Sequence, residues 1–422
     1  MSGSGGIQIV QVVKRYGPVG GMERYVWELT RELQNMGHEV TVICERCHMD
    51  KPAGISVVEL GETAKRPRWL SQVRFSRRVT RWVREHPCNG HGADATPDNK
   101  IHHARFPHPN PDETTSHSIK LPKDGSQVDG YLPKGRAQRG GRSRTNEPLR
   151  EFHVNDRVIH SHERLGVHDV TTFHGPPFAT IYEKGWWRFI SLRVWVRLYL
   201  ERRELETARV IVPNSSFISR QLAHYYPEMT EKISAPVIPG VLPMRPREPR
   251  AVAADGGVVG FVGWEWQRKG LPQAMEIVAA LRSARPNLEL WVVGPDPSEL
   301  KPLFAGWAGG YRLLGWREDN AYLNELDVLL HPARAEPYGM VISEAMAARV
   351  PVVISDVCGA ATHVLPDAGS VLSLSAPVAA WARAVEQQLT RMEPVPQYDR
   401  SWATVAHEYE RIYREILEDK LK

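Results

Sequence analysis

The sequence predicts an α/β protein with two Rossmann-like domains, and three observations support this fold class. The chain has 422 residues, more than a single hydrophobic core usually organises. Apolar runs at 7–13 and 39–44 flank an amphipathic helix, and a strand–helix–strand unit of this kind requires a parallel sheet. A further apolar run at 257–263 opens a similar pattern behind a proline-rich segment, 243–249, where we place the domain boundary.

The first domain, expected over residues 7–242, begins with a strand and a glycine-containing loop. The helix after this loop is expected over 22–36, with Gly37 as the residue that ends it. Gly20 and Gly21 let the backbone approach a ligand closely, and the N–H groups at a helix start attract phosphate. A simple tight turn is the alternative interpretation. The loop lacks the G-x-G-x-x-G pattern, so we expect no nicotinamide dinucleotide.

The next helical stretch, residues 65–86, combines many arginines with apolar side chains at helical spacing, including Trp69, Phe75, Val79 and Trp82. A basic amphipathic helix can lie on an anionic lipid surface. The same pattern also fits an ordinary surface helix whose apolar side packs in the core, so the sequence leaves both interpretations open.

Residues 89–155 differ in composition from the rest of the chain. His, Pro, Gly and charged side chains dominate and apolar residues are scattered, so ordering this stretch would recover little hydrophobic free energy. We therefore expect a largely irregular insertion in the first domain. The spacing of its histidines fits no standard metal site. The stretch 139–144 is rich in arginine, but we expect the protein to bind no nucleic acid.

Two later strands of the first domain are expected to end in histidine, at His162 and His174. Ligands of open α/β sheets lie at the carboxyl ends of the strands, so both side chains should reach the binding region. His174 is our candidate for contact with the ligand, and His162 is second. The helical stretch 185–205 mixes Trp, Tyr, Leu and Arg. It can face a lipid-linked acceptor or pack in the core.

The second domain, expected over residues 250–396, places Arg268 and Lys269 shortly after its first strand. Two adjacent cations in this position can neutralise a diphosphate, the arginine as a fork and the lysine as a point charge. Further strands are expected at 288–295, 311–316, 326–332 and 350–355, and a last helix at 401–421.

The stretch 336–347 reads E-P-Y-G-M-V-I-S-E-A-M-A and has two carboxylates eight positions apart. A buried strand precedes it and good helix formers follow, which predicts a strand, a tight loop and a helix. Glu336 is expected in the loop and Glu344 one to two turns into the helix, facing the same crevice. Free N–H groups at the helix start suit a diphosphate. One carboxylate can hold a ribose diol and the other a sugar hydroxyl.

These motifs resemble the retaining glycosyltransferases of family four, which have the GT-B fold. The resemblance rests on the 336–347 pattern, on the G-G-x-E-R sequence at 20–24, and on the cations near 268. It covers roughly 7–88 and 157–420. It implies two domains facing across a cleft and a C-terminal helix, 397–422, that packs back on the N-terminal domain. The short link between the two histidine-ending strands is similar to the lipopolysaccharide-core branch of the family, whose members act on heptose and glucose.

The resemblance also implies roles for individual residues. His174 and Glu336 would orient the transferred sugar, and Glu344 would bind the ribose. Lys269 and Arg268 would stabilise the leaving diphosphate. The remaining donor-binding residues expected from the family pattern are Gly20, Gly21, Tyr338, Gly339, Met340 and Val341.

The implied reaction is metal-independent transfer of a hexose, with retention, from a nucleotide diphosphate sugar such as UDP-glucose. The acceptor would be a saccharide or lipid-linked molecule in envelope polysaccharide or lipopolysaccharide synthesis. No cofactor and no metal ion are expected, since no Asp-x-Asp motif occurs. Two alternatives stay open. One is a nucleotide-sugar epimerase of the same fold, and the other is a non-catalytic scaffold that binds sugar nucleotides.

Composition limits the remaining possibilities. The formal net charge of +5 is a mild basic excess, which fits anionic partners such as sugar nucleotides or a membrane surface. No apolar run is long enough to span a bilayer and the N-terminus is no signal peptide, so we expect a cytoplasmic protein, peripheral on the inner membrane face at most. The letters C-E-R-C-H at 44–48 spell a haem attachment motif, which requires export. We instead expect Cys44 to end a core strand.

Overall fold

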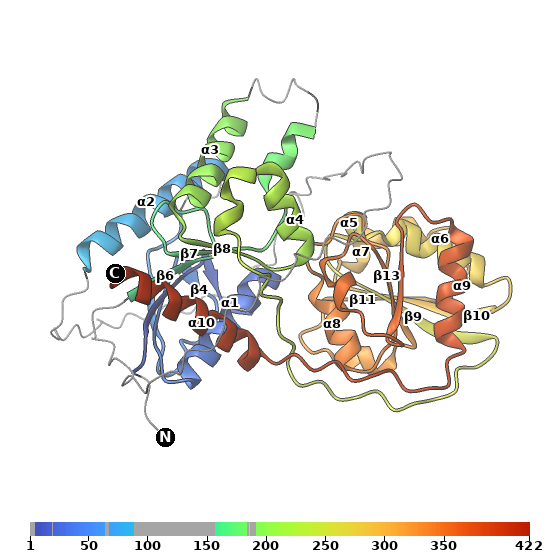
Figure 1. Cartoon of the computed structure of the whole chain (residues 1–422). Coiled ribbons are helices and arrows are strands. Elements are labelled where there is room, and N and C mark those ends of the chain that lie inside the picture. The colour runs from blue at the N-terminus through green and yellow to red at the C-terminus, as the bar shows by residue number, and fades with distance from the viewer. Residues whose placement is uncertain (1–4, 19, 64–66, 88–156, 184, 186–190) are drawn as a thin grey trace, which may run out of the picture.

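The computed structural model describes residues 5–18, 20–63, 67–87, 157–183, 185 and 191–422. Figure 1 shows two lobes, each a twisted sheet with helices on its faces, joined by chain segments that pass between them. The expected insertion at 89–155, with its histidines and its arginine-rich stretch, lies outside the described residues. The first four residues of the N-terminal leader lie outside them too.

The N-terminal lobe is built on a six-stranded parallel sheet. The strand order is β5-β3-β1-β6-β7-β8, which is the Rossmann order 3-2-1-4-5-6. The strands are β1 (Gln8–Val12), β3 (Glu39–Cys44), β5 (Ser56–Glu59), β6 (Arg157–Ser161), β7 (Val170–Phe173) and β8 (Val210–Pro213). Two short strands, β2 (Arg15–Tyr16) and β4 (Arg46–Cys47), pair separately. The predicted strand–helix–strand unit is confirmed, and Cys44 is a buried residue at the end of β3.

The helices described in this part of the chain are α1 (Gly21–Asn35), α2 (Arg68–Glu85), α3 (Leu192–Thr207) and α4 (Ser216–Tyr225). Gly37 has a φ of 88°, as expected for the residue that ends α1. The helix expected from 185 was wrong at its start, because Gly185 is not helical and α3 begins at Leu192, after Ser191 in extended conformation. Residues 186–190 lie outside the described part of the chain.

The apolar side of α2 packs in the core rather than facing lipid. Phe75 and Val79 are fully buried in a cluster with strand residues of the sheet, and Trp82 and Val83 pack against it. Four arginines at positions 74, 77, 81 and 84 are exposed, and their spacing places them on the opposite face of the helix. The structure therefore places the apolar side of this helix in the core and leaves the arginine face exposed.

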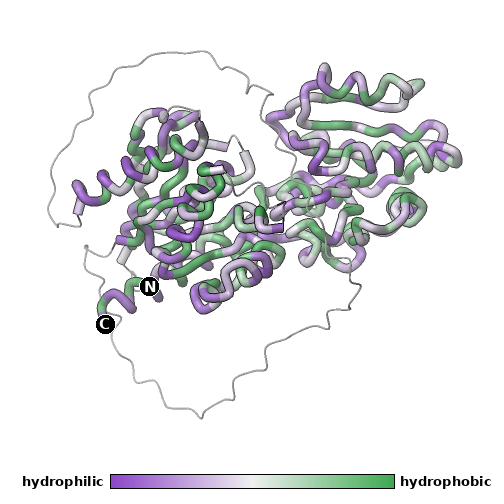
Figure 2. Tube along the Cα trace, turned by 90° about the horizontal axis from the view of Figure 1, so that it is seen from above, coloured by the Kyte–Doolittle hydropathy of each residue, from purple (hydrophilic) through white to green (hydrophobic). Residues whose placement is uncertain are grey.

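The C-terminal lobe repeats the same architecture. Its parallel sheet has the order β11-β10-β9-β12-β13-β14. The strands are β9 (Gly256–Val262), β10 (Asn287–Val293), β11 (Tyr311–Gly315), β12 (Val328–His331), β13 (Val352–Ser355) and β14 (Gly369–Leu372). The helices are α5 (Trp266–Lys269), α6 (Leu271–Leu281), α7 (Pro297–Leu300), α8 (Met340–Ala347) and α9 (Val378–Leu389). Figure 2 shows hydrophobic segments running through both lobes, and most strand residues are buried, as in strands covered on both faces.

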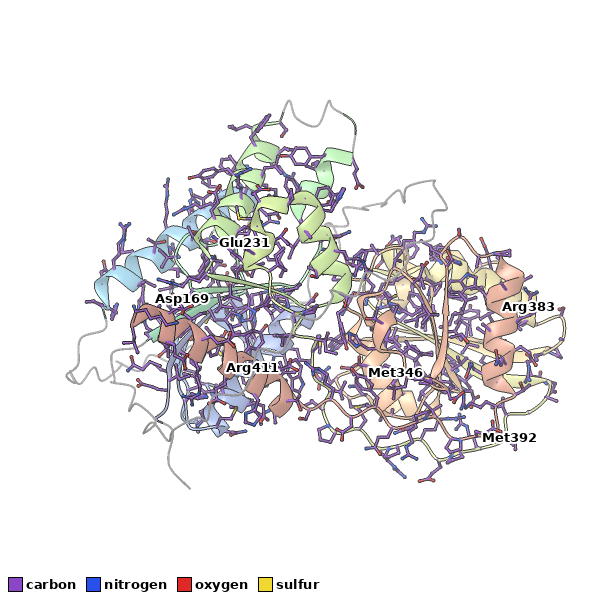
Figure 3. All side chains as sticks on the ribbon, in the orientation of Figure 1. Asp169, Glu231, Met346, Arg383, Met392 and Arg411 are labelled. Carbon is purple, nitrogen blue, oxygen red and sulfur yellow. The ribbon has the colours of Figure 1, made fainter. Side chains whose placement is uncertain are left out.

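The last helix, α10 (Trp402–Lys420), returns to the N-terminal lobe. It begins at Ser401, whose hydroxyl accepts a hydrogen bond from the N–H of Thr404 at 3.1 Å. Its buried face, which includes Trp402, Tyr409 and Tyr413, shares one apolar cluster with α1 and the first strand. Figure 3 places Arg411 of this helix with the N-terminal lobe, whereas Met346 of α8 lies in the C-terminal lobe. The predicted crossover helix is confirmed.

Within the described residues, no helix combines the length and the apolar character that crossing a lipid bilayer requires.

Candidate active site

A buried carboxylate surrounded by cations lies in the loop between β12 and α8. Oε2 of Glu336 is 3.3 Å from Nζ of Lys269 and 3.5 Å from a guanidinium nitrogen of Arg268. Nε2 of His331, the last residue of β12, is also 3.5 Å away. Glu336 is only 7% exposed. The structure thus brings Arg268 and Lys269 to Glu336, which lies 67 positions after Lys269 in the sequence.

The charge state of Glu336 follows from these neighbours. Burial alone would raise the pKa of the carboxyl group, but Lys269, His331 and Arg268 outweigh it and hold that pKa well below its usual range. Burial also lowers the pKa of the fully buried His331, which favours the neutral ring. Glu336 is therefore an ionised hydrogen-bond acceptor at neutral pH and not a proton donor.

The two cations come from the short helix α5, shortly after β9, where the sequence placed them. Lys269 crosses the end of β9, and a β-carbon on Gly263, whose φ is 141°, would lie 2.3 Å from its Cδ. Glycine at this position is thus required for the lysine to reach Glu336. Arg268 is held more tightly, by Glu265 at 2.6 Å and by the carbonyl oxygen of Ala335. Lys269 is the cation with more freedom to meet a ligand.

Backbone hydrogen bonds fix the Glu336 loop against the segment after β13. The carbonyl oxygen of Glu336 accepts from the N–H of Gly359 at 2.9 Å, and that of Tyr338 accepts from Ala360 at 2.8 Å. Gly339 has a φ of 93°, and a β-carbon there would lie 3.0 Å from Cγ of Glu336. The turn therefore depends on glycine at position 339.

The side chain of Tyr338 points away from the candidate site. Its ring is 3% exposed in the core of the lobe, and its hydroxyl pairs with Ser343 at 2.8 Å. Its predicted contact with the donor is thus limited to the main chain. Met340 and Val341 are the first two residues of α8, so their N–H groups have no acceptor within the helix. These N–H groups remain available to an anion.

Glu344, on α8, is paired with the other lobe. Its Oε1 accepts a hydrogen bond from Arg24 at 2.8 Å, and the carboxylate is almost completely buried. Arg24 lies on the first turn of α1, which begins at Gly21 with Gly20 as its N-terminal cap residue. The structure therefore brings the glycine loop of the first lobe to the second carboxylate of the 336–347 motif.

His174 follows β7 and joins this region through α1. Its Nε2 is 2.8 Å from Nδ1 of His162, and its ring meets the edge of Tyr25, the neighbour of Arg24, at a centroid distance of 4.8 Å. The adjacent strand end makes another link, since the hydroxyl of Ser215 donates to the carbonyl oxygen of Pro337 at 2.6 Å. Both histidines predicted from strand ends thus lie together, with His174 partly exposed and His162 buried.

Three residues of the site were not foreseen from the sequence. His331 was treated only as the end of a buried strand, although a polar side chain at that position, five residues before Glu336, was a usable signal. Arg24 was recognised only as part of the G-G-x-E-R motif, and no contact was predicted for its side chain. Gln11, inside the first strand, hydrogen-bonds His162 at 2.8 Å, and a polar side chain in the middle of an apolar run was the available signal.

Comparison with known protein families decides the classification. Residues 256–391 match the family described as glycosyl transferases group 1, and residues 19–111 match glycosyltransferase family 4. The chain belongs to glycosyltransferase family four. The two matches fall on different lobes, which agrees with the family's two-domain fold.

The curated relatives match parts of the chain. The lipopolysaccharide glucosyltransferase WaaG of Escherichia coli K12 is 34% identical over 134 residues, which is 30% of this chain and 36% of that protein. A GDP-mannose-dependent alpha-mannosyltransferase of Mycolicibacterium smegmatis is 29% identical over 223 residues, 49% of this chain and 54% of that one. The chain thus spans about a third to a half of the length of these family members.

Solved structures agree on the fold over the whole chain. The crystal structure of WaaG matches with a TM-score of 0.64 at 18% identity, covering 98% of each chain. A sucrose-phosphate synthase from Thermosynechococcus elongatus matches with a TM-score of 0.62 at 15% identity, covering 98% of this chain and 100% of the other. At these identities the likeness concerns the family's fold alone.

Proposed function

We propose that this protein is a retaining glycosyltransferase that moves a hexose from a nucleotide diphosphate sugar to a saccharide or lipid-linked acceptor. The observation that carries the proposal is the cluster of Lys269, Arg268 and Glu336, with ion-pair distances of 3.3 and 3.5 Å. It combines a cation for a leaving diphosphate with an ionised acceptor for sugar hydroxyls at the carboxyl ends of parallel strands.

In this proposal each group has a distinct task. Lys269 and Arg268 stabilise the negative charge that grows on the diphosphate as the glycosidic bond breaks. The N–H groups of Met340 and Val341 share that charge, and Glu344 binds the ribose. Because these side chains neutralise the charge of the diphosphate, we expect activity to persist when divalent metals are chelated. The leaving phosphate itself takes the acceptor proton, so no protein base is assigned.

Glu336 and His174 orient the transferred hexose. Glu336 is ionised, so it accepts hydrogen bonds from sugar hydroxyls and strengthens as an acceptor when water leaves the closed site. His174 extends from the opposite lobe, so bringing the lobes together would enclose the sugar between the two side chains.

We further propose UDP-glucose as the donor and a lipopolysaccharide core as the acceptor. The support is similarity to the E. coli glucosyltransferase, whose name states that it acts on lipopolysaccharide, and to the core biosynthesis glycosyltransferase LpsE of Rhizobium meliloti, 36% identical over 106 residues. The mycobacterial relative, named for GDP-mannose, makes the donor a question for experiment.

The exposed surface of α2 and α3 is our candidate for contact with a lipid-linked acceptor or an anionic membrane. The two helices contact each other in the N-terminal lobe. The α2 arginines at 74, 77, 81 and 84 are exposed, and α3 presents Leu192, Trp195 and Tyr199, which are 70%, 55% and 63% exposed. Basic and aromatic side chains on one surface suit the interface of an anionic bilayer.

A panel of UDP-glucose, UDP-galactose, ADP-glucose and GDP-mannose tests the proposal. A transferase without its acceptor hydrolyses the correct donor slowly to free hexose and nucleoside diphosphate, whereas an epimerase returns an isomeric nucleotide sugar. A scaffold binds a donor without converting it. We expect slow hydrolysis of one donor, with release of the sugar in its original anomeric configuration, and an inverted sugar or an epimer would contradict the assignment.

A further inference from the structure

A row of buried polar side chains leads from the candidate site to the terminal helix. Nε2 of His174 is 2.8 Å from Nδ1 of His162, whose Nε2 is 2.8 Å from Oε1 of Gln11. Nε2 of Gln11 donates to the hydroxyl of Tyr413 on α10 at 3.1 Å. That hydroxyl is 2.6 Å from Nδ1 of His160. Four different elements thus contribute to one continuous chain of hydrogen bonds.

Gln11 gives this chain a direction, because the two ends of an amide differ. Its NH₂ group only donates, and it donates to Tyr413. Its carbonyl oxygen only accepts, so the hydrogen between Gln11 and His162 belongs to Nε2 of His162. Tyr413 fits this direction, since it accepts from Gln11 and has its own proton left for Nδ1 of His160.

The same direction continues along the hydrogen bonds from His162 to His174. Complete burial lowers the pKa of His162 well below its usual value, so its ring is neutral and carries one proton. That proton is on Nε2, which leaves Nδ1 as an acceptor, and its partner among the described residues is Nε2 of His174, which must carry the hydrogen. Burial likewise lowers the pKa of His174, to about 3, so its Nδ1 carries no proton.

We propose that Gln11 and His162 are positioning residues that fix His174 as the Nε2–H tautomer, whose bare Nδ1 accepts a hydrogen bond from one hydroxyl of the transferred sugar. This inference rests on the proposed function for its ligand, but the tautomer itself does not depend on it. The two ring nitrogens point in different directions, so Nδ1 is the ring's remaining polar atom for a ligand. Such a site selects a sugar with a hydroxyl donor at that position and rejects one without it.

The arrangement also gives the crossover helix a part in the site. Tyr413 reaches Gln11 from the far end of the chain, and its hydroxyl is fully buried. Without this acceptor, the amide of Gln11 is free to turn over and present its NH₂ group to His162. The direction of the hydrogen bonds would then reverse. Nδ1 of His174 would carry a proton and could no longer accept a hydrogen bond from the sugar hydroxyl.

The tautomer is measured directly on the full chain with ¹⁵N-labelled histidine. Nitrogen chemical shifts distinguish protonated from bare ring nitrogens, and the His174→Gln variant assigns the signal. We expect a bare Nδ1 and a protonated Nε2 on His174, with the Tyr413→Phe variant showing a mixture of tautomers. A protonated Nδ1 on His174 in the unchanged protein would overturn the inference, whether or not the protein turns over any donor.

A kinetic experiment tests the link to the sugar. Gln11→Leu should lower kcat/KM for the converted donor about tenfold, the value of one hydrogen bond, and should have no such effect on a deoxy donor that lacks the selected hydroxyl. Gln388→Leu removes another buried glutamine, in the C-terminal lobe, and controls for general damage to the fold. An equal loss on every deoxy donor would show a merely structural role and would contradict the inference.

Discussion

Lys269 has two tasks in the candidate site, and they explain why one substitution there should be severe. Its ammonium group is 3.3 Å from the buried carboxylate of Glu336. Among the neighbours that lower the pKa of Glu336 and keep it ionised, Lys269 has the largest effect, so the lysine is the main counter-charge of this carboxylate. A diphosphate beside Lys269 would share the same ammonium, so the residue couples the leaving group to the residue that orients the sugar.

Lys269→Ala should therefore weaken binding of the nucleotide sugar by about 100-fold, as expected when one partner of a buried charge pair is removed. Titration calorimetry with UDP-glucose, or with the donor selected from the panel, measures the change. Lys301→Ala removes an exposed lysine of the same lobe and should leave the affinity unchanged. Equal affinities for the two variants would contradict the role of Lys269.

At this scale the sequence predicted the residues of the motif but not their partners. Glu336, Glu344 and Lys269 were recognisable because their spacing relative to a strand and a helix is local. The pairing of Glu344 with Arg24 was not predictable, since it joins positions 320 residues apart. Tyr338 was predicted to contact the donor, but an aromatic ring beside a tight turn fits the core equally well, and the core is where it lies.

Helix α3 has two carboxylates on its buried face and one arginine to pair with them. Glu201 forms an ion pair with Arg164 at 2.6 Å and also accepts a hydrogen bond from the hydroxyl of Tyr226 at 2.8 Å. Glu204 is 3.9 Å from the same arginine and accepts from Thr171 at 2.6 Å. Burial with this incomplete compensation raises the pKa of Glu204 to about 8.

This shift predicts a pH dependence of stability. A Glu204 carboxyl with a pKa near 8 when folded, against 4.5 ordinarily, binds its proton more tightly in the folded chain. Its contribution to stability is complete below pH 4.5 and is lost as pH rises towards 8, by on the order of 1 kcal/mol per pH unit. Glu204→Gln should remove this slope in urea unfolding between pH 5 and 8, whereas Glu206→Gln, on the exposed face, should retain it. Parallel slopes for all three proteins would refute the assignment.

Helix α10 packs on the N-terminal lobe, although the helix before it in the sequence, α9, belongs to the C-terminal lobe. Trp402, at its first turn, is 3% exposed and lies edge-on to Tyr25 of α1 at a centroid distance of 5.2 Å. Trp402→Ala should lower the free energy of unfolding of the N-terminal lobe by about 3–5 kcal/mol, because it leaves a large cavity. Denaturation followed by circular dichroism measures the loss, and Glu415→Ala on the exposed face should cost almost nothing. A loss confined to the C-terminal lobe would contradict the packing.

At the scale of elements, most of the fold was predictable because each strand is a short apolar run and each helix has its own periodicity. The exceptions have physical reasons. The stretch near 185 reads as helical from its composition, yet the helix begins at Leu192, so composition did not fix its first residue. The location of α10 was expected from family resemblance alone, because amphipathicity shows that a helix needs a partner but not which one.

At the scale of the whole molecule, the lobes meet at the candidate site through polar contacts, an apolar side chain and the approach of α4 to residues Gly359–His363 of the C-terminal lobe. Arg24 bonds to Glu344 at 2.8 Å, and the hydroxyl of Ser215 bonds to the carbonyl oxygen of Pro337 at 2.6 Å. Met340, the first residue of α8, packs against apolar clusters of both lobes. The two polar contacts and Met340 all involve the 336–347 motif, so this segment links donor binding to the relation between the lobes.

The Arg24–Glu344 pair has a particular consequence, because Glu344 is also the residue proposed to bind the ribose. Arg24 occupies one oxygen of that carboxylate. Its removal leaves a buried carboxylate without its partner, at a cost of roughly 1–3 kcal/mol that separation of the lobes relieves by admitting water. Arg24→Met keeps the apolar part of the side chain but not the ion pair.

We therefore expect Arg24→Met to have a larger radius of gyration than the unchanged protein in small-angle X-ray scattering without nucleotide. Saturating donor should abolish the difference, because the ribose hydroxyls then satisfy Glu344 in both proteins and the lobes close on the ligand. Arg31→Met, on the same helix, breaks a half-exposed pair with Glu28 and should scatter like the unchanged protein. If Arg24→Met is as compact as this control without nucleotide, the ion pair does not hold the lobes together, and the remaining contacts between them, including those of Ser215, Met340 and α4, are sufficient to do so.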